Sequence, residues 1–83
     1  MKNLKILIVD DSELFASATR EFLVASAGIE SVTVVLSGAE ALARVKDLKP
    51  DLVLTDLNMP GMNGLEVTRA VKESWATTKV IVV

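Results

Sequence analysis

Cysteine and histidine are both absent from this chain. Without cysteine, the chain can form no disulfide, thiolate nucleophile or cysteine-based zinc site, and we expect a cytoplasmic location. Without histidine, it has no imidazole for acid–base catalysis and cannot carry a phosphohistidine. These two absences exclude several common classes of catalytic and metal-binding site.

A strong excess of charge and a long apolar run are also missing. Nine basic and eleven acidic side chains are scattered along the sequence and give a formal net charge of −2. Because no basic stripe is present, we expect no direct binding to nucleic acid. No apolar run is long enough for a membrane helix, and the segment that follows Met1 to Lys5 is too short for a signal-peptide core. We therefore expect neither a membrane span nor export.

The residues that are present indicate one small globular domain. The chain has 83 residues, of which 51% are hydrophobic and 24% charged. This balance is typical of folded proteins. A chain of this length buries only roughly 60–65% of the surface that its unfolded form exposes, so we expect modest stability.

Four short segments have the composition of buried strands, since they are apolar and rich in β-branched residues. They are Ile6 to Val9, Val32 to Leu36, Leu52 to Thr55, and Lys79 to Val83.

Three helices are predicted between these strands. The first covers residues 12–27, and Gly28 would end it in a left-handed conformation. The second begins with the capping box of Ser37 and Glu40 and ends before Pro50, and the third begins with Asn63 and Glu66 as a cap. The apolar residues at helical spacing are Phe15, Ala18, Phe22 and Ala25 in the first helix, Leu42, Val45 and Leu48 in the second, and Val67, Ala70, Val71 and Trp75 in the third.

Strands that alternate with helices across short loops predict right-handed crossovers and a doubly wound parallel sheet with helices on both faces. The fold class is therefore α/β. Functional sites of such sheets form at the carboxyl ends of the strands.

Three acidic residues stand at these positions. Asp10 and Asp11 follow the first strand, and Asp56 follows the third. If these strands are neighbours, about 4.8 Å apart, the carboxylates converge and repel one another. A divalent cation would relieve that repulsion, and an all-oxygen site favours Mg²⁺, with Mn²⁺ or Ca²⁺ as substitutes. Taken singly, an aspartate after a strand is more often a turn former or a helix cap than a metal ligand.

Two motifs closely resemble the receiver domains of bacterial two-component systems. They are "ILIVDD" from Ile6 to Asp11 and "DLVLTDLNMPGMNG" from Asp51 to Gly64. The resemblance runs through the whole chain and implies a flavodoxin-like fold, in which the sheet order is second, first, third, fourth and fifth strand.

The resemblance also implies the role of each site residue. Asp56 would be the phosphoacceptor, Asp11 a direct Mg²⁺ ligand, Asp10 a second acidic support for the ion, and Asn58 a ligand through its backbone carbonyl. The phosphoryl group would come from a sensor histidine kinase or a phosphotransfer protein. The chain would then be a signalling domain that assists its own phosphorylation and dephosphorylation, and not a conventional enzyme.

Complete receivers continue beyond the point that Val83 matches. They add a hydroxyl residue after the fourth strand, a fifth strand that ends in lysine, and two more helices. Residues 1–83 are therefore expected to form a single partial receiver domain, whose exposed fourth strand invites self-association.

Two other functions remain open at this point. A hydrolase of the haloacid-dehalogenase type also uses a strand-end aspartate and Mg²⁺, but usually has a second aspartate where this chain has Asn58. An interaction scaffold that is never phosphorylated is the other alternative. The role of Gly64 is also open, because it could be a permissive helix cap or a point of close approach.

Overall fold

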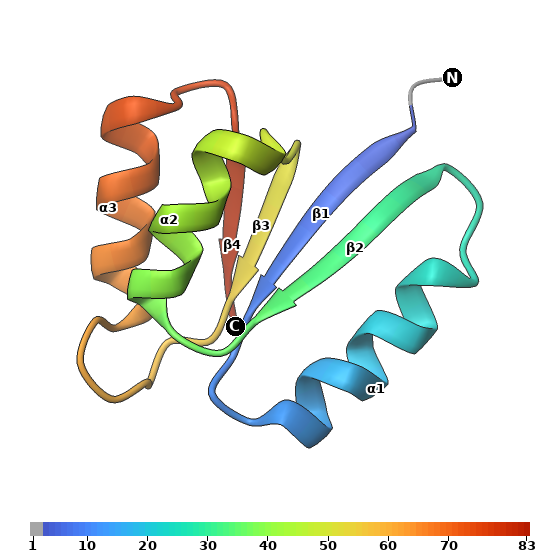
Figure 1. Cartoon of the computed structure of the whole chain (residues 1–83), viewed down its shortest axis with the longest axis horizontal. Helices are drawn as coiled ribbons and strands as arrows, with labels where there is room; N and C mark the ends of the chain where they lie inside the picture. The colour runs from blue at the N-terminus through green and yellow to red at the C-terminus, as the bar shows by residue number, and fades with distance from the viewer. Residues whose placement is uncertain (1–2) are drawn as a thin grey trace.

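The computed structural model describes residues 3–83 and contains four strands and three helices that alternate along the chain (Figure 1). In chain order, they are β1 (Leu4–Val9), α1 (Glu13–Val24), β2 (Ile29–Val35), α2 (Gly38–Leu48), β3 (Leu52–Thr55), α3 (Gly64–Ser74) and β4 (Lys79–Val82). The strands form one parallel sheet in the order β2-β1-β3-β4. This arrangement confirms the α/β, flavodoxin-like architecture, in its incomplete form.

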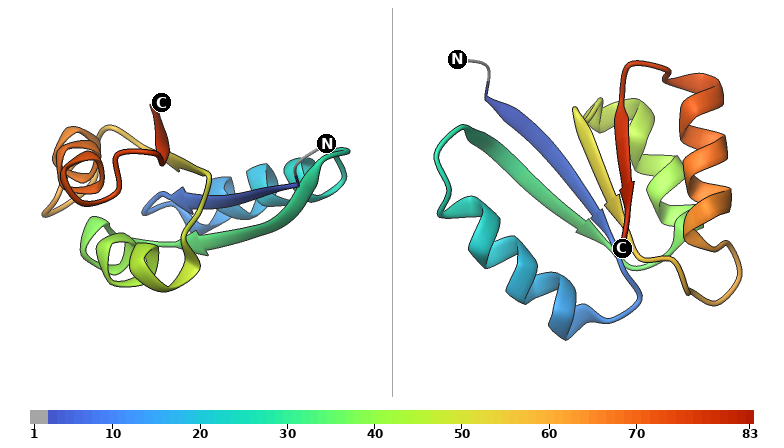
Figure 2. Two further views of the ribbon diagram at one scale, coloured as in Figure 1. Left: turned by 90° about the horizontal axis from the view of Figure 1, so that it is seen from above. Right: turned by 180° about the vertical axis from the view of Figure 1, so that it is seen from behind.

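The sheet is covered unequally on its two faces, as the two views of Figure 2 show. On one face, Leu7 and Val9 of β1 and Val53 of β3 are fully buried beneath α2 and α3. On the other face, Ile6 and Ile8 pack with the buried Ala16 of α1. Because α1 is the single helix on that face within residues 3–83, the part of the sheet built from β3 and β4 is left open there.

The register of β1 and β3 positions the acidic residues. Ile6 pairs with Leu52, and Val9 pairs with Thr55, so both strands end at the same level. The next residues, Asp10 and Asp56, therefore leave the sheet side by side at its carboxyl edge.

The predicted helix caps are confirmed. The side chain of Ser37 accepts a hydrogen bond from the amide of Glu40 at 3.1 Å, and Glu40 in turn accepts from the amide of Leu36 at 3.0 Å. Asn63 and Glu66 form a full capping box at the start of α3. Each cap satisfies amides that the first turn of a helix leaves without a partner.

The prediction for α1 was wrong at its end. The helix ends at Val24, because Ser26 turns back and donates from its amide to Leu23 and from its hydroxyl to Phe22. Gly28 has a φ of 85° but lies in the turn before β2. The apolar residues that were used to predict this helix, namely Phe15, Ala18, Phe22 and Ala25, are all exposed, since α1 faces the sheet with Ala16 and Leu23.

Three further expectations can be compared with the structure. Trp75, predicted among the apolar residues of the third helix, packs against the core together with Met62 and the buried Met59. β2 begins at Ile29, three residues before the predicted start, because its first part pairs with Leu4. Over residues 3–83, no helix is long and apolar enough to cross a membrane, whereas Met1 and Lys2 lie outside the described residues.

Candidate phosphoryl and metal site

Asp10 is the buried member of the acidic group, with 6% of its surface exposed. Its carboxylate accepts a hydrogen bond from the amide of Ser12 at 2.9 Å, and its own amide donates to the carbonyl of Val35 at 3.2 Å. The end of β2 therefore holds the backbone of this residue, and the start of α1 holds its side chain. Ser12 has a second role as the N-cap of α1.

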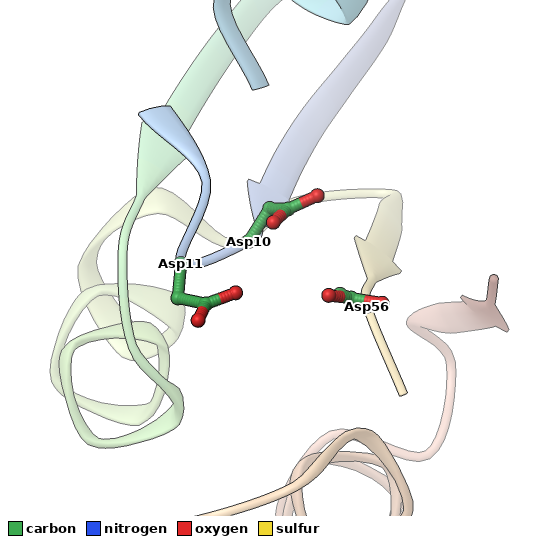
Figure 3. A group of neighbouring side chains, drawn as sticks. All are labelled: Asp10, Asp11 and Asp56. Atoms are coloured by element: carbon green, nitrogen blue, oxygen red, sulfur yellow. The ribbon is translucent and has the colours of Figure 1, made fainter. Parts of the chain in front are cut away.

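Asp11 and Asp56 complete the group, as Figure 3 shows. Asp11 is exposed and Asp56 is half-buried, and their carboxylates point toward each other across the gap between the two strand ends. One carboxylate oxygen from each of the three aspartates can be chosen so that all lie within 4.8 Å of one another. Within residues 3–83, neither Asp11 nor Asp56 forms an ion pair, so no lysine or arginine balances the negative charge.

The backbone around Asp56 is held from three directions. Its amide donates to the carbonyl of Val9 at 2.8 Å, and its carbonyl accepts from the hydroxyl of Thr55 at 3.1 Å. The amide of Leu57 donates to the carbonyl of Val83 at 3.2 Å. The carboxylate, in contrast, makes no hydrogen bond among the described residues.

Asn58 lies in the exposed loop that follows β3. The loop is anchored by the buried Met59 and turns at Gly61, which has a φ of 77°. A carbonyl ligand from Asn58 would reach the site from this loop, and that role stays a prediction.

The sequence did not reveal a small hollow that adjoins the acidic group. Phe15 and Thr19 of α1 form one wall of it, and the open face of the sheet forms the other. The complete lining consists of Ile8, Val9, Asp10, Phe15, Thr19, Leu54, Thr55, Asp56 and Val83. Phe15, one of the apolar residues at helical spacing, is 57% exposed. The arrangement thus joins a cluster of carboxylates to an apolar surface.

Residues 6–83 match the family model described as response regulator receiver domain. The chain belongs to this family. Two relatives illustrate the match: response regulator GacA of Pseudomonas syringae is 40% identical over 80 residues, and protein-glutamate methylesterase/protein-glutamine glutaminase 5 of Myxococcus xanthus is 41% identical over 80 residues. Each alignment covers 96% of this receiver chain, but only 37% and 23% of the respective relative. The receiver is thus the part that these longer proteins share with this chain.

Solved structures agree with the family assignment. The chemotaxis protein CheY4 of Vibrio cholerae is 33% identical to this receiver and superposes on it with a TM-score of 0.87. The superposition covers 96% of this chain and 67% of CheY4. The response regulator domain of CheB from Thermotoga maritima is 28% identical and superposes with a TM-score of 0.88. The superposition covers 98% of this chain and 60% of the CheB chain. This membership in a signalling family argues against the haloacid-dehalogenase alternative.

Proposed function

We propose that this receiver accepts a phosphoryl group on Asp56 from a sensor histidine kinase or a phosphotransfer protein. The observation that carries the proposal is the convergence of the three carboxylates at one edge of the sheet, with that of Asp56 unbonded and turned toward Asp11. Residues 1–83 contain no histidine, so a phosphohistidine donor would lie outside this segment. A cytoplasmic location remains part of this proposal.

The donor set also fits Mg²⁺. Three carboxylates within a few ångströms supply hard oxygen ligands of the kind that Mg²⁺ prefers, and we assign Asp10, Asp11 and Asp56 to the ion together with the carbonyl of Asn58. When bound, the ion screens the negative charges of the aspartates and the incoming phosphate. The geometry therefore supports a receiver that needs the ion for phosphorylation.

The chain's own part in the reaction is to present one oxygen nucleophile. A carboxylate oxygen of Asp56 forms a bond to phosphorus while the bond from phosphorus to the donor breaks, and the donor keeps that electron pair. The hydrogen bonds to Val9 and Thr55 hold the backbone of Asp56 in place, so the fold positions this residue before the phosphoryl donor arrives. Since the acyl phosphate remains on the chain, the product is a signalling state and not a released compound.

The direct test uses acetyl phosphate as the donor and intact mass as the measurement. With Mg²⁺ present, we expect the mass to rise by one phosphoryl group, and with the ion removed by a chelator we expect no measurable rise. Magnesium binding without any mass increase would instead favour a scaffold that is never phosphorylated.

A second test addresses the metal ligands. Asp11→Asn is expected to weaken Mg²⁺ binding by at least about tenfold, because it removes an exposed carboxylate that faces Asp56. Asp51→Asn is the matched control, because Asp51 lies at the opposite end of β3 and its side chain accepts from the amide of Lys5, which an asparagine oxygen can also do. Calorimetric titration measures both affinities. Equal affinity in the wild type and Asp11→Asn would remove Asp11 from the site.

A further inference from the structure

The first residue of α3, Gly64, lies in unusually close contact with the backbone of Asp56. A Cβ atom added to Gly64 would overlap the carbonyl oxygen of Asp56, and would lie 3.0 Å from the Cα of Leu57 and 3.1 Å from the carbonyl carbon of Asp56. The amide of Gly64 also donates to the carbonyl of Leu57 at 2.9 Å. The start of α3 is thus pressed against the residue that we assign as the phosphoacceptor.

Position 64 requires glycine because no space is left for a Cβ atom. Among the described residues, the glycines with positive φ are Gly28 and Gly61, so the backbone of Gly64 is in a region open to any residue. Of the two roles that the sequence left open for Gly64, a permissive helix cap or a point of close approach, the structure therefore favours close approach. Gly61, only three residues earlier, is the opposite case, because its φ is 77° but an added Cβ would meet nothing within 4 Å.

If a side chain were added at Gly64, the segment around Asp56 would have to move. The helix side of the contact is fixed, because Val67 and Val71 of α3 are fully buried and Asn63 is tied by the capping box. The atoms on the other side are backbone, which cannot swing away as a flexible side chain can. Asp56 and Leu57 lie just beyond the end of β3, where single hydrogen bonds with Val9, Thr55 and Val83 hold their backbone, so this segment gives way before the buried face and capped start of α3.

We infer that Gly64 is a positioning residue that sets the distance of Asp56 from Asp10 and Asp11, an inference that rests on the proposed function. A displacement of Asp56 by several tenths of an ångström exceeds the tolerance of about 0.2 Å typical of metal–ligand distances. Misplacement of a reacting group by about 1 Å can slow a reaction about 100-fold. A single methyl group at Gly64 would therefore impair both the metal site and the reaction.

The test compares Gly64→Ala with Gly61→Ala in the 83-residue chain, using Mg²⁺ and acetyl phosphate as probes. Both substitutions lower stability, one through overlap and the other through backbone strain. Loss of folded protein lowers the labelled fraction, whereas misplacement lowers the rate constant of the molecules that are folded. We expect the rate constant of Gly64→Ala to fall by about 10- to 100-fold, and that of Gly61→Ala to stay within about threefold of the wild type.

A measurement independent of phosphorylation is the NMR position of the backbone amides of Asp56 and Leu57. These resonances should shift strongly in Gly64→Ala, while the amides of Val67 and Val71 stay near their wild-type positions. If Gly64→Ala is unfolded, a low temperature and a stabilising osmolyte should restore it, since the buried valines are unchanged. Failure to recover a folded protein under these conditions would overturn the inference.

The outcomes separate the inference from the function on which it rests. A wild-type chain that takes up no phosphoryl group would contradict the proposed function, and the amide shifts together with the Mg²⁺ affinity would still decide the role of Gly64. A wild-type chain that is labelled, together with equal rate constants and equal amide positions in the two variants, would overturn the inference alone.

Discussion

Phosphoryl uptake is expected to be lost completely when Asp56 is replaced by asparagine. The side-chain amide has nearly the same shape as the carboxylate but is not a nucleophile toward phosphorus, so no acyl phosphate can form. Because the carboxylate of Asp56 makes no hydrogen bond among residues 3–83, the substitution leaves no donor without its partner. Intact mass after incubation with acetyl phosphate and Mg²⁺ measures the loss.

The same variant should change stability in opposite directions with and without the ion. Removal of one of three neighbouring negative charges relieves repulsion, which at such distances is on the order of 1 kcal/mol in water, so Asp56→Asn should unfold at a higher temperature when Mg²⁺ is absent. With Mg²⁺ present, the wild type should gain more, because it binds the ion more tightly. Asp47→Asn, on the exposed side of α2, is the control and should be labelled normally. Unchanged labelling of Asp56→Asn would place the acceptor elsewhere.

A polypeptide made of residues 1–83 is expected to associate through the free edge of β4. The amides of Lys79 and Val83 donate to Asp51 and Thr55 on the β3 side. Since neighbouring residues of a strand direct their backbone groups to alternate sides, Val80 and Val82 turn theirs outward. Unpaired edges of this kind readily bind another strand.

The edge pattern is also self-complementary. If two β4 strands pair in antiparallel orientation about a two-fold axis centred on Ile81, Val80 of each copy exchanges two hydrogen bonds with Val82 of the other. The two Ile81 side chains, each 51% exposed in the single chain, then lie directly opposite each other on the open face of the sheet. The pairing would thus bury an apolar residue at its centre.

Ile81→Lys should abolish this association, because it places two positive charges opposite each other where the isoleucines would meet. Leu65→Lys makes a similar exchange at a 60% exposed residue that belongs to α3 and not to β4, so it should leave association unchanged. Sedimentation equilibrium distinguishes the two variants. A wild-type polypeptide that stays monomeric at high concentration would contradict the expected pairing.

Most of the fold and the three acidic residues could be predicted, because they depend on local patterns. Ile6 to Val9 form an unbroken apolar run, which is typical of a strand buried on both faces, and the structure places it in the middle of the sheet. Asn63 and Glu66 predict the start of a helix, because their capping contacts lie within four residues. Once β1 and β3 are known to be neighbours, the positions of Asp10 and Asp56 follow from their register.

The features that could not be predicted depend on contacts between distant residues. Phe15 and Phe22 have the spacing of a buried helix face but are 57% and 74% exposed, because only the sheet decides which side of α1 is covered. The close contact of Gly64 with Asp56 arises from the way in which α3 docks, and from the sequence alone a glycine at this position could equally be a permissive cap. Neither outcome is encoded in the nearby sequence alone.

The position of β1 between β2 and β3 has a consequence for the order of folding. β1 can pair with β2 once residue 35 has been synthesised, whereas its pairing with β3 joins Ile6 to Leu52 and must wait for a later part of the chain. Contacts between residues so distant in sequence form slowly, because a long loop must close first. Asp10 and Asp11 belong to the early unit, and Asp56 to the late one. The three acids therefore meet only when β1 has paired with β3, so a nascent or half-folded chain lacks the assembled acidic site.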